Sequence, residues 1–191
     1  MIQANPTLQT FDDFLATAEG LEVRYELTNG ELIEMPPETY GNLVIARFLD
    51  RVLSEIVGFQ HVCTHQVVLE MPGQPKNRFP DLIVLHPDHP EQLMSQKQAS
   101  IRLDMAPPML VIEIVSPGSE NHRRDYIDKR NQYEWRGIPE YWIADPVLGQ
   151  ITVLVLTDNG YEEAVFSGDA LVRSPAFPEL TVTTEAILSP T

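Results

Sequence analysis

The chain has 191 residues, a formal net charge of −15 at pH 7 and a single cysteine, Cys63. This length suits one domain with a sizeable core, and no apolar run reaches the roughly 20 residues that a membrane-spanning helix needs. The strong negative charge excludes a protein that coats nucleic acid indiscriminately with Lys and Arg. The lone thiol excludes a disulfide framework and indicates a cytoplasmic location.

The first predicted elements are a short helix and a hairpin. Thr10 is a typical N-cap residue, the apolar residues after it have helical spacing, and Gly20 marks the expected end of the helix. Residues 23–37 are expected to form a hairpin, because the dipeptide Asn29-Gly30 favours a tight turn with positive φ angles.

The middle of the chain alternates between one helix and several strands. Residues 42–58 carry an apolar stripe at helical spacing and end in a glycine, which predicts a helix. Residues 60–71 alternate and are expected to form one strand, and residues 78–87 form a second strand that stops at a proline. Residues 88–108 read as a loop with a short helix, and 109–117 as a buried strand.

The last third contains a helix over residues 123–137, a buried strand over 140–146, a hairpin over 150–167 and a short strand with a helical turn over 178–188. Taken together, the elements predict a single α/β or α+β domain over residues 1–191, with an apolar sheet covered by helices. The apolar second hairpin offers an edge for self-association, so a homodimer is expected.

Glu113 stands in the middle of the apolar run "VIEIV", where it shares one strand face with Val111 and Val115. Burying a carboxylate is costly unless the group is paired or binds a metal ion. Asp81 stands at the start of the preceding apolar strand. If these two strands are neighbours, both acids converge at one end of the sheet.

Two carboxylates with room for water are ligands that Mg²⁺ prefers, and such an ion polarises phosphoryl groups. Lys129 lies four residues after Asp125 on the next helix, so both project from one side, where Lys129 can stabilise charge on a phosphate. Glu26 and Glu31 flank the first hairpin turn, and either could supply a third carboxylate.

Structural alternatives exist for each of these residues. Glu113 could instead form a buried ion pair with Arg124 or Lys129, and Asp81 could be a solvated acid at a strand end. The histidines lack the helical spacing of zinc sites, so all of them are expected to be structural or surface residues. They are His61, His65, His86, His89 and His122.

Four segments together resemble the Uma-two family of endonucleases, which belongs to the PD-(D/E)XK superfamily with the restriction-endonuclease-like fold. They are "YELTNGELIEMPP", "PDLIVL", "VIEIVSPGS…RRDYIDKRNQYEWRGIPEYWIADP" and "LVRSPAFPELTV". The resemblance covers about residues 20–185. It implies a mixed central sheet flanked by helices, with additional N- and C-terminal hairpins.

The resemblance also implies roles for individual residues. Asp81 and Glu113 would bind Mg²⁺ or Mn²⁺. The superfamily pattern places a lysine at position 115, where this chain has Val115. Lys129 on the following helix matches the place to which some branches move this lysine. Glu31, rather than Glu26, matches an acidic position of the family.

The function implied is that of a Mg²⁺-dependent endonuclease acting on DNA. Arg123 and Arg124, with Lys129 and Arg130, form a local basic cluster that can meet phosphate despite the net negative charge. Two alternatives remain open: a binding or regulatory module of the same fold that does not cut, and a subunit that acts only with a partner protein. No membrane partner is expected.

Overall fold

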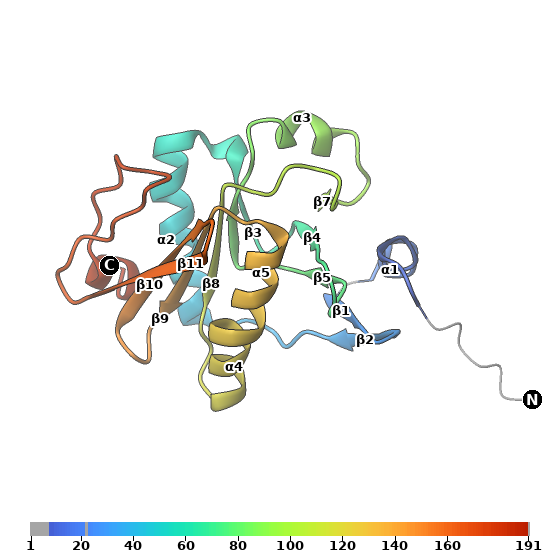
Figure 1. The fold of residues 1–191 in the computed structure, drawn as a ribbon, viewed down its shortest axis with the longest axis horizontal. Helices are drawn as coiled ribbons and strands as arrows, with labels where there is room; N and C mark the ends of the chain where they lie inside the picture. The colour runs from blue at the N-terminus through green and yellow to red at the C-terminus, as the bar shows by residue number, and fades with distance from the viewer. Residues whose placement is uncertain (1–7, 22, 191) are drawn as a thin grey trace, which may run out of the picture.

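The computed structural model describes residues 8–21 and 23–190. Its centre is a six-stranded sheet with the order β11-β10-β9-β8-β6-β3 (Figure 1). In chain order these strands are β3 (Val62–Thr64), β6 (Leu82–Val84), β8 (Leu110–Ile114), β9 (Glu140–Asp145), β10 (Gln150–Thr157) and β11 (Gly160–Ser167).

The sheet is mixed. β8 and β9 run parallel, while the pairs β3–β6, β6–β8, β9–β10 and β10–β11 are antiparallel. A parallel pair needs a crossover connection. Here the crossover consists of α4 (Ser119–Arg123), the π-helix η2 (Arg124–Lys129) and α5 (Arg130–Arg136). The mixed central sheet and the C-terminal hairpin β10–β11 are as predicted.

Helices cover both faces of the sheet (Figure 1). Helix α2 (Tyr40–Val57) packs on one face, where Ile112 of β8 joins the first core. The α4–η2–α5 helix covers the other face, where Val111 and Val115 join a second core with Tyr133. Strand alternation therefore assigns the residues of β8 to two cores, as the sequence indicates.

The N-terminal elements form a separate layer beside this sheet. Helix α1 (Phe11–Ala18) begins with a capping box formed by Thr10 and Asp13. The hairpin of β1 (Tyr25–Thr28) and β2 (Glu31–Glu34) turns through Asn29 and Gly30, with φ angles of 51° and 87°. The predicted helix and hairpin are therefore present.

The strand expected over residues 60–71 is wrong as a single element. The segment divides into β3 and β4 (Val68–Glu70), because His65 has a φ of 56° and turns the chain out of the central sheet. β4 then pairs with β5 (Asn77–Arg78) and β7 (Ser100–Ile101) in a three-stranded sheet. The segment 78–87 is likewise shared between β5 and β6.

Three short helices complete the chain: η1 (Phe59–His61), α3 (His89–Met94) and α6 (Thr184–Leu188). The expected strand near the C-terminus is reduced to an isolated bridge between Leu171 and Thr183. Within the described residues, no helix is long and apolar enough to cross a membrane. β11 is an edge strand of the central sheet, and self-association through it stays a prediction.

The side chain of Asn77 connects β5 to the N-terminal hairpin through hydrogen bonds. Its side chain is fully buried. Its amide oxygen accepts a hydrogen bond from the Leu27 N–H at 2.8 Å, and its amide nitrogen donates to the Tyr25 carbonyl at 3.0 Å. One side chain thus satisfies two backbone groups of β1.

We expect Asn77→Ala to lower the free energy of unfolding by about 2–4 kcal/mol, because one buried and one part-buried backbone group lose their partners, the buried one at about 1–3 kcal/mol and the other at less. Urea denaturation followed by circular dichroism measures the change. Glu34→Ala, at an exposed position of the same hairpin, serves as the control and should be nearly neutral. An equally small effect of Asn77→Ala would contradict this role.

Candidate metal and catalytic site

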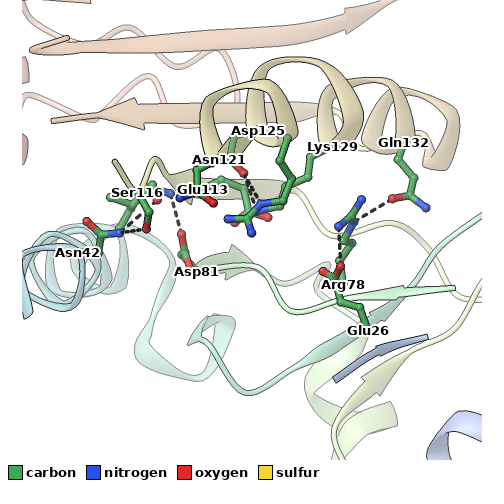
Figure 2. A network of polar contacts seen from close by, with 12 residues as sticks. Glu26, Asn42, Arg78, Asp81, Glu113, Ser116, Asn121, Asp125, Lys129 and Gln132 are labelled. Carbon is green, nitrogen blue, oxygen red and sulfur yellow. Dashed lines mark hydrogen bonds and ion pairs between the residues drawn. The ribbon is translucent and has the colours of Figure 1, made fainter. Parts of the chain in front are cut away.

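Strand pairing brings Asp81 and Glu113 to one end of the central sheet. Leu82 of β6 pairs with Ile112 of β8, and one further step of the same antiparallel register sets Asp81 opposite Glu113. The Ile114 N–H donates a hydrogen bond to Asp81 Oδ2 at 2.7 Å. The carboxylate thus accepts from β8 in place of a backbone carbonyl of the neighbouring strand. Figure 2 shows Asp81 beside this strand end.

Glu113 lies at the centre of a buried polar cluster. Its side chain is 1% exposed. Lys129 Nζ lies 2.9 Å from Glu113 Oε2 and 2.7 Å from Asp125 Oδ1. The Tyr133 hydroxyl donates to Glu113 Oε1 at 2.5 Å. Figure 2 shows Asp125 and Lys129 reaching from the covering helix towards Glu113.

The local conformation of the helix sets this arrangement. Asp125, Lys129 and Tyr133 are spaced four residues apart, and the first two lie in the π-helical segment η2. A π turn has i→i+5 hydrogen bonds and is wider than an α turn, and such turns occur frequently at functional sites. The widened turn keeps all three side chains on the face that meets β8.

Burial and charge shift the pKa values of the central groups. Burial raises the pKa of Glu113 to about 7, against the attraction of Lys129, and the nearby charges of Asp81 and Asp125 add to the rise. Burial alone would lower the pKa of Lys129, but Glu113 and Asp125 outweigh it and raise that pKa. Lys129 is therefore a fixed cation and a hydrogen-bond donor.

Asp81 and Tyr133 also keep defined protonation states. Burial alone would raise the pKa of Asp81, but His65, Lys129 and the Ile114 N–H together lower it, so Asp81 is a carboxylate. Burial, with the charge of Glu113, raises the pKa of Tyr133 well above its ordinary value, so its hydroxyl stays a donor.

A cleft of about 630 Å³ opens next to Asp81 on the side of α2. Its lining includes Arg24, Glu38 and His65. His65 Nδ1 lies 3.4 Å from Asp81 Oδ1. Burial and the charge of Asp81 raise the pKa of Glu38, whose Oε2 accepts a hydrogen bond from Asn42 Nδ2 at 3.0 Å. The cleft therefore borders His65 and Glu38, while Asp81 behind His65 is only 7% exposed.

The structure does not bring Glu31 to this cluster, because Glu31 is exposed in the hairpin and paired with Thr28. Glu26 points inward instead, and its Oε2 accepts a hydrogen bond from Arg78 Nη1 at 2.8 Å. Arg78 Nε in turn donates to Gln132 Oε1 at 2.9 Å, which connects the hairpin to α5 (Figure 2).

The expected basic cluster is largely neutralised by neighbouring acids. Arg124 Nε lies 3.5 Å from Asp125 Oδ1, and the Arg124 side chain is 32% exposed. Arg123, 68% exposed, pairs with Asp128 at 3.2 Å. Arg130 pairs with Glu163 at 2.7 Å. Arg124 is thus beside the buried cluster, while Arg123 is on the outer surface.

The sequence interpretation missed several residues of this site. Tyr133 continues the four-residue spacing of Asp125 and Lys129, and this spacing was a usable signal. His65 and Glu38 had no such signal, because their approach to Asp81 depends on how β3 and α2 meet the sheet. His65 was expected to be structural or on the surface, but it borders the cleft and Asp81.

The residues at this site suit a divalent cation. Glu113 and Asp125 both pair with Lys129, Asp81 lies opposite Glu113, and Asp125 Oδ2 is buried without a hydrogen-bond partner. Mg²⁺ commonly binds one or two carboxylates and keeps several waters. In residues 8–21 and 23–190, no group of three or more His, Cys, Asp or Glu side chains is arranged so that it could hold a metal ion.

The mixed sheet with helices on both faces defines a restriction-endonuclease-like α+β fold. The model of the Uma2 family, described as a putative restriction endonuclease, matches residues 11–185, and the chain belongs to this family. A crystal structure of a putative nuclease of the DUF820 group from Anabaena variabilis is similar, with a TM-score of 0.66, 20% identity, and coverage of 95% of this chain and 98% of that one. None of the curated proteins matches the sequence.

The raised pKa of Glu113 predicts a dependence of stability on pH. Between its ordinary value of 4.5 and about 7, the folded protein keeps a proton that the unfolded chain releases. The free energy of unfolding should therefore fall as pH rises through this window, by on the order of 3 kcal/mol from this group.

Urea denaturation at several pH values between 4.5 and 7, with a chelator present, measures this slope. Glu113→Gln should remove most of it, whereas Glu31→Gln, at an exposed position, should keep the slope of the parent protein. Identical slopes in the parent protein and Glu113→Gln would contradict the assignment.

Proposed function

We propose that the protein is a divalent-metal-dependent endonuclease that hydrolyses phosphodiester bonds of DNA, with Mg²⁺ or Mn²⁺ as cofactor. The observation that carries the proposal is the placement of Lys129 2.9 Å from Glu113, at the strand end where Asp81 lies opposite Glu113. The family description and the similarity to the crystal structure of a putative nuclease support the same class of activity.

Asp81 and Glu113 would hold the ion with their carboxylate oxygens. When bound, the ion supplies stabilisation of the charge that builds on the phosphate and promotes attack by water. Asp81 suits this role because its lowered pKa keeps it ionised. Glu113 is oriented by the Tyr133 hydroxyl, so it is held in one position before any ligand arrives.

Lys129 acts as a cation in this proposal. Its raised pKa keeps the amine protonated, so it can orient the attacking water or stabilise negative charge, but it does not accept a proton. Asp125 fixes the direction of the amine at 2.7 Å. This cation takes the role that the superfamily pattern gives to a lysine at position 115, where the chain has a buried valine.

Phosphate contacts would come from partly exposed arginines close to the site. Arg124 retains an exposed fraction of 32% beside Asp125, and Arg24 lines the cleft that reaches Asp81. Arg123 would add a contact farther out. Local positive charge of this kind can bind DNA although the whole chain carries −15. Glu38, which borders the cleft, replaces Glu31 as the proposed third acid.

One observation favours a second candidate, a nuclease-fold binding module or a subunit that needs a partner protein to cut. Both oxygens of Glu113 already have partners, Tyr133 and Lys129, so the cluster is largely satisfied without metal. A buried ion pair of this type can be purely structural.

Metal binding is the first test. Saturating Mn²⁺ or Mg²⁺ should raise the melting temperature, because an ion that binds only the folded state adds about 2.7 kcal/mol at a concentration one hundred times its Kd. Asp81→Asn and Glu113→Gln should abolish this response, whereas Glu31→Gln should retain it. Differential scanning fluorimetry provides the measurement, and a response of both site variants equal to that of the parent protein would refute the site.

Cleavage is the second test. Incubation with supercoiled plasmid and Mn²⁺ should give nicked DNA, and Lys129→Met should reduce the rate about 10²–10³-fold, the usual loss on removing one electrostatic donor. Lys97→Met, at an exposed ion pair with Glu19, serves as the control. Circular dichroism checks that the Lys129 variant is folded. Metal binding without nicking would favour the binding module.

A further inference from the structure

His65 has a backbone conformation that few histidines adopt. Its φ of 56° lies in the left-handed region, which costs free energy for a residue other than glycine. Its N–H donates to the Asp81 carbonyl at 3.2 Å, which extends the β3–β6 pairing by one step. The turn of the chain at His65 therefore places its side chain next to that of Asp81.

The imidazole of His65 has no hydrogen-bond partner of its own. Nδ1 lies 3.4 Å from Asp81 Oδ1, and both ring nitrogens are buried without a hydrogen bond. Leaving a buried polar group unpaired is unfavourable, and each such group in a native structure needs an explanation, for example an ion that binds there.

Two other histidines show what a structural role looks like in this chain. His89 is fully buried, and both of its ring nitrogens have partners, the His86 N–H at 3.2 Å and the Ala106 carbonyl at 2.9 Å. His61 Nδ1 lies 3.0 Å from the Val57 carbonyl. His65 differs from both, because its ring nitrogens have no hydrogen bond and Nδ1 lies only at 3.4 Å from Asp81 Oδ1.

Two carboxylic acids lie near His65. Asp81 is on one side, and Glu38 borders the same cleft. Two ligands on a single ion with bonds of about 2.1 Å lie about 3–3.5 Å apart. The separation of 3.4 Å between His65 Nδ1 and Asp81 Oδ1 matches this spacing.

We propose that His65 supplies a nitrogen ligand to the divalent ion held by Asp81, and that this ligand makes the site prefer Mn²⁺ or another transition ion to Mg²⁺. The inference rests on the proposed function, because it concerns the same ion. Its chemical basis is that imidazole binds transition ions well, whereas Mg²⁺ prefers oxygen ligands and water.

Pulsed electron paramagnetic resonance of the full chain with Mn²⁺ tests the proposal directly, because a coordinated imidazole gives a ¹⁴N modulation. We expect this modulation in the parent protein and its loss in His65→Asn. Asparagine tolerates a positive φ, so this variant preserves the backbone turn. His61→Asn, on the preceding turn, is the matched control and should keep the signal.

Titration calorimetry with each metal adds a second measurement. His65→Asn should weaken Mn²⁺ binding about 10-fold or more and weaken Mg²⁺ binding much less, so that the ratio of the two affinities changes. If the nitrogen signal and this ratio are unchanged in His65→Asn while Asp81→Asn no longer binds metal, the role of His65 is refuted and the proposed function stands. If the parent protein binds neither ion, both proposals are refuted.

Discussion

The ion cluster of Lys129, Glu113 and Asp125 is the constraint on which the rest of the structure depends. A carboxylic acid in the centre of a buried strand is unfavourable unless a cation reaches it, and here the crossover helix between β8 and β9 carries that cation. The cluster therefore determines how this helix is rotated over the sheet. The same rotation brings Tyr133 to the second oxygen of Glu113 and leaves Arg124 partly exposed beside Asp125.

The site is formed at the end of the pairing between β6 and β8. β8 continues beyond its pairing with β6, and Asp81 fills the vacated position by accepting the Ile114 N–H. The helix side contributes a fixed cation, and the α2 side contributes His65, Glu38 and an open cleft. Glu113 has polar partners on the helix side, whereas Asp125 Oδ2 and both ring nitrogens of His65 have no hydrogen-bond partner.

Much of this arrangement could be predicted from the sequence. The Asn29-Gly30 turn, the alternation around Glu113 and the four-residue step from Asp125 to Lys129 are local signals, and each one determined its element correctly. The division of residues 60–71 could not be predicted, because it depends on which sheet each half joins. The different roles of Glu26 and Glu31 could not be predicted either, because both residues flank the same turn. Only tertiary packing shows that Glu26 forms the ion pair with Arg78.

The π turn of η2 has a consequence for how this chain can vary in length. It holds one residue more than an α turn would need at the same place. Deleting a residue between Asp125 and Lys129 would return this segment to an α turn and keep the flanking helical turns in register, but it would leave Asp125 and Lys129 only three residues apart. The extra residue therefore sets the spacing of the two charged groups that meet at Glu113, and not the direction of the helix.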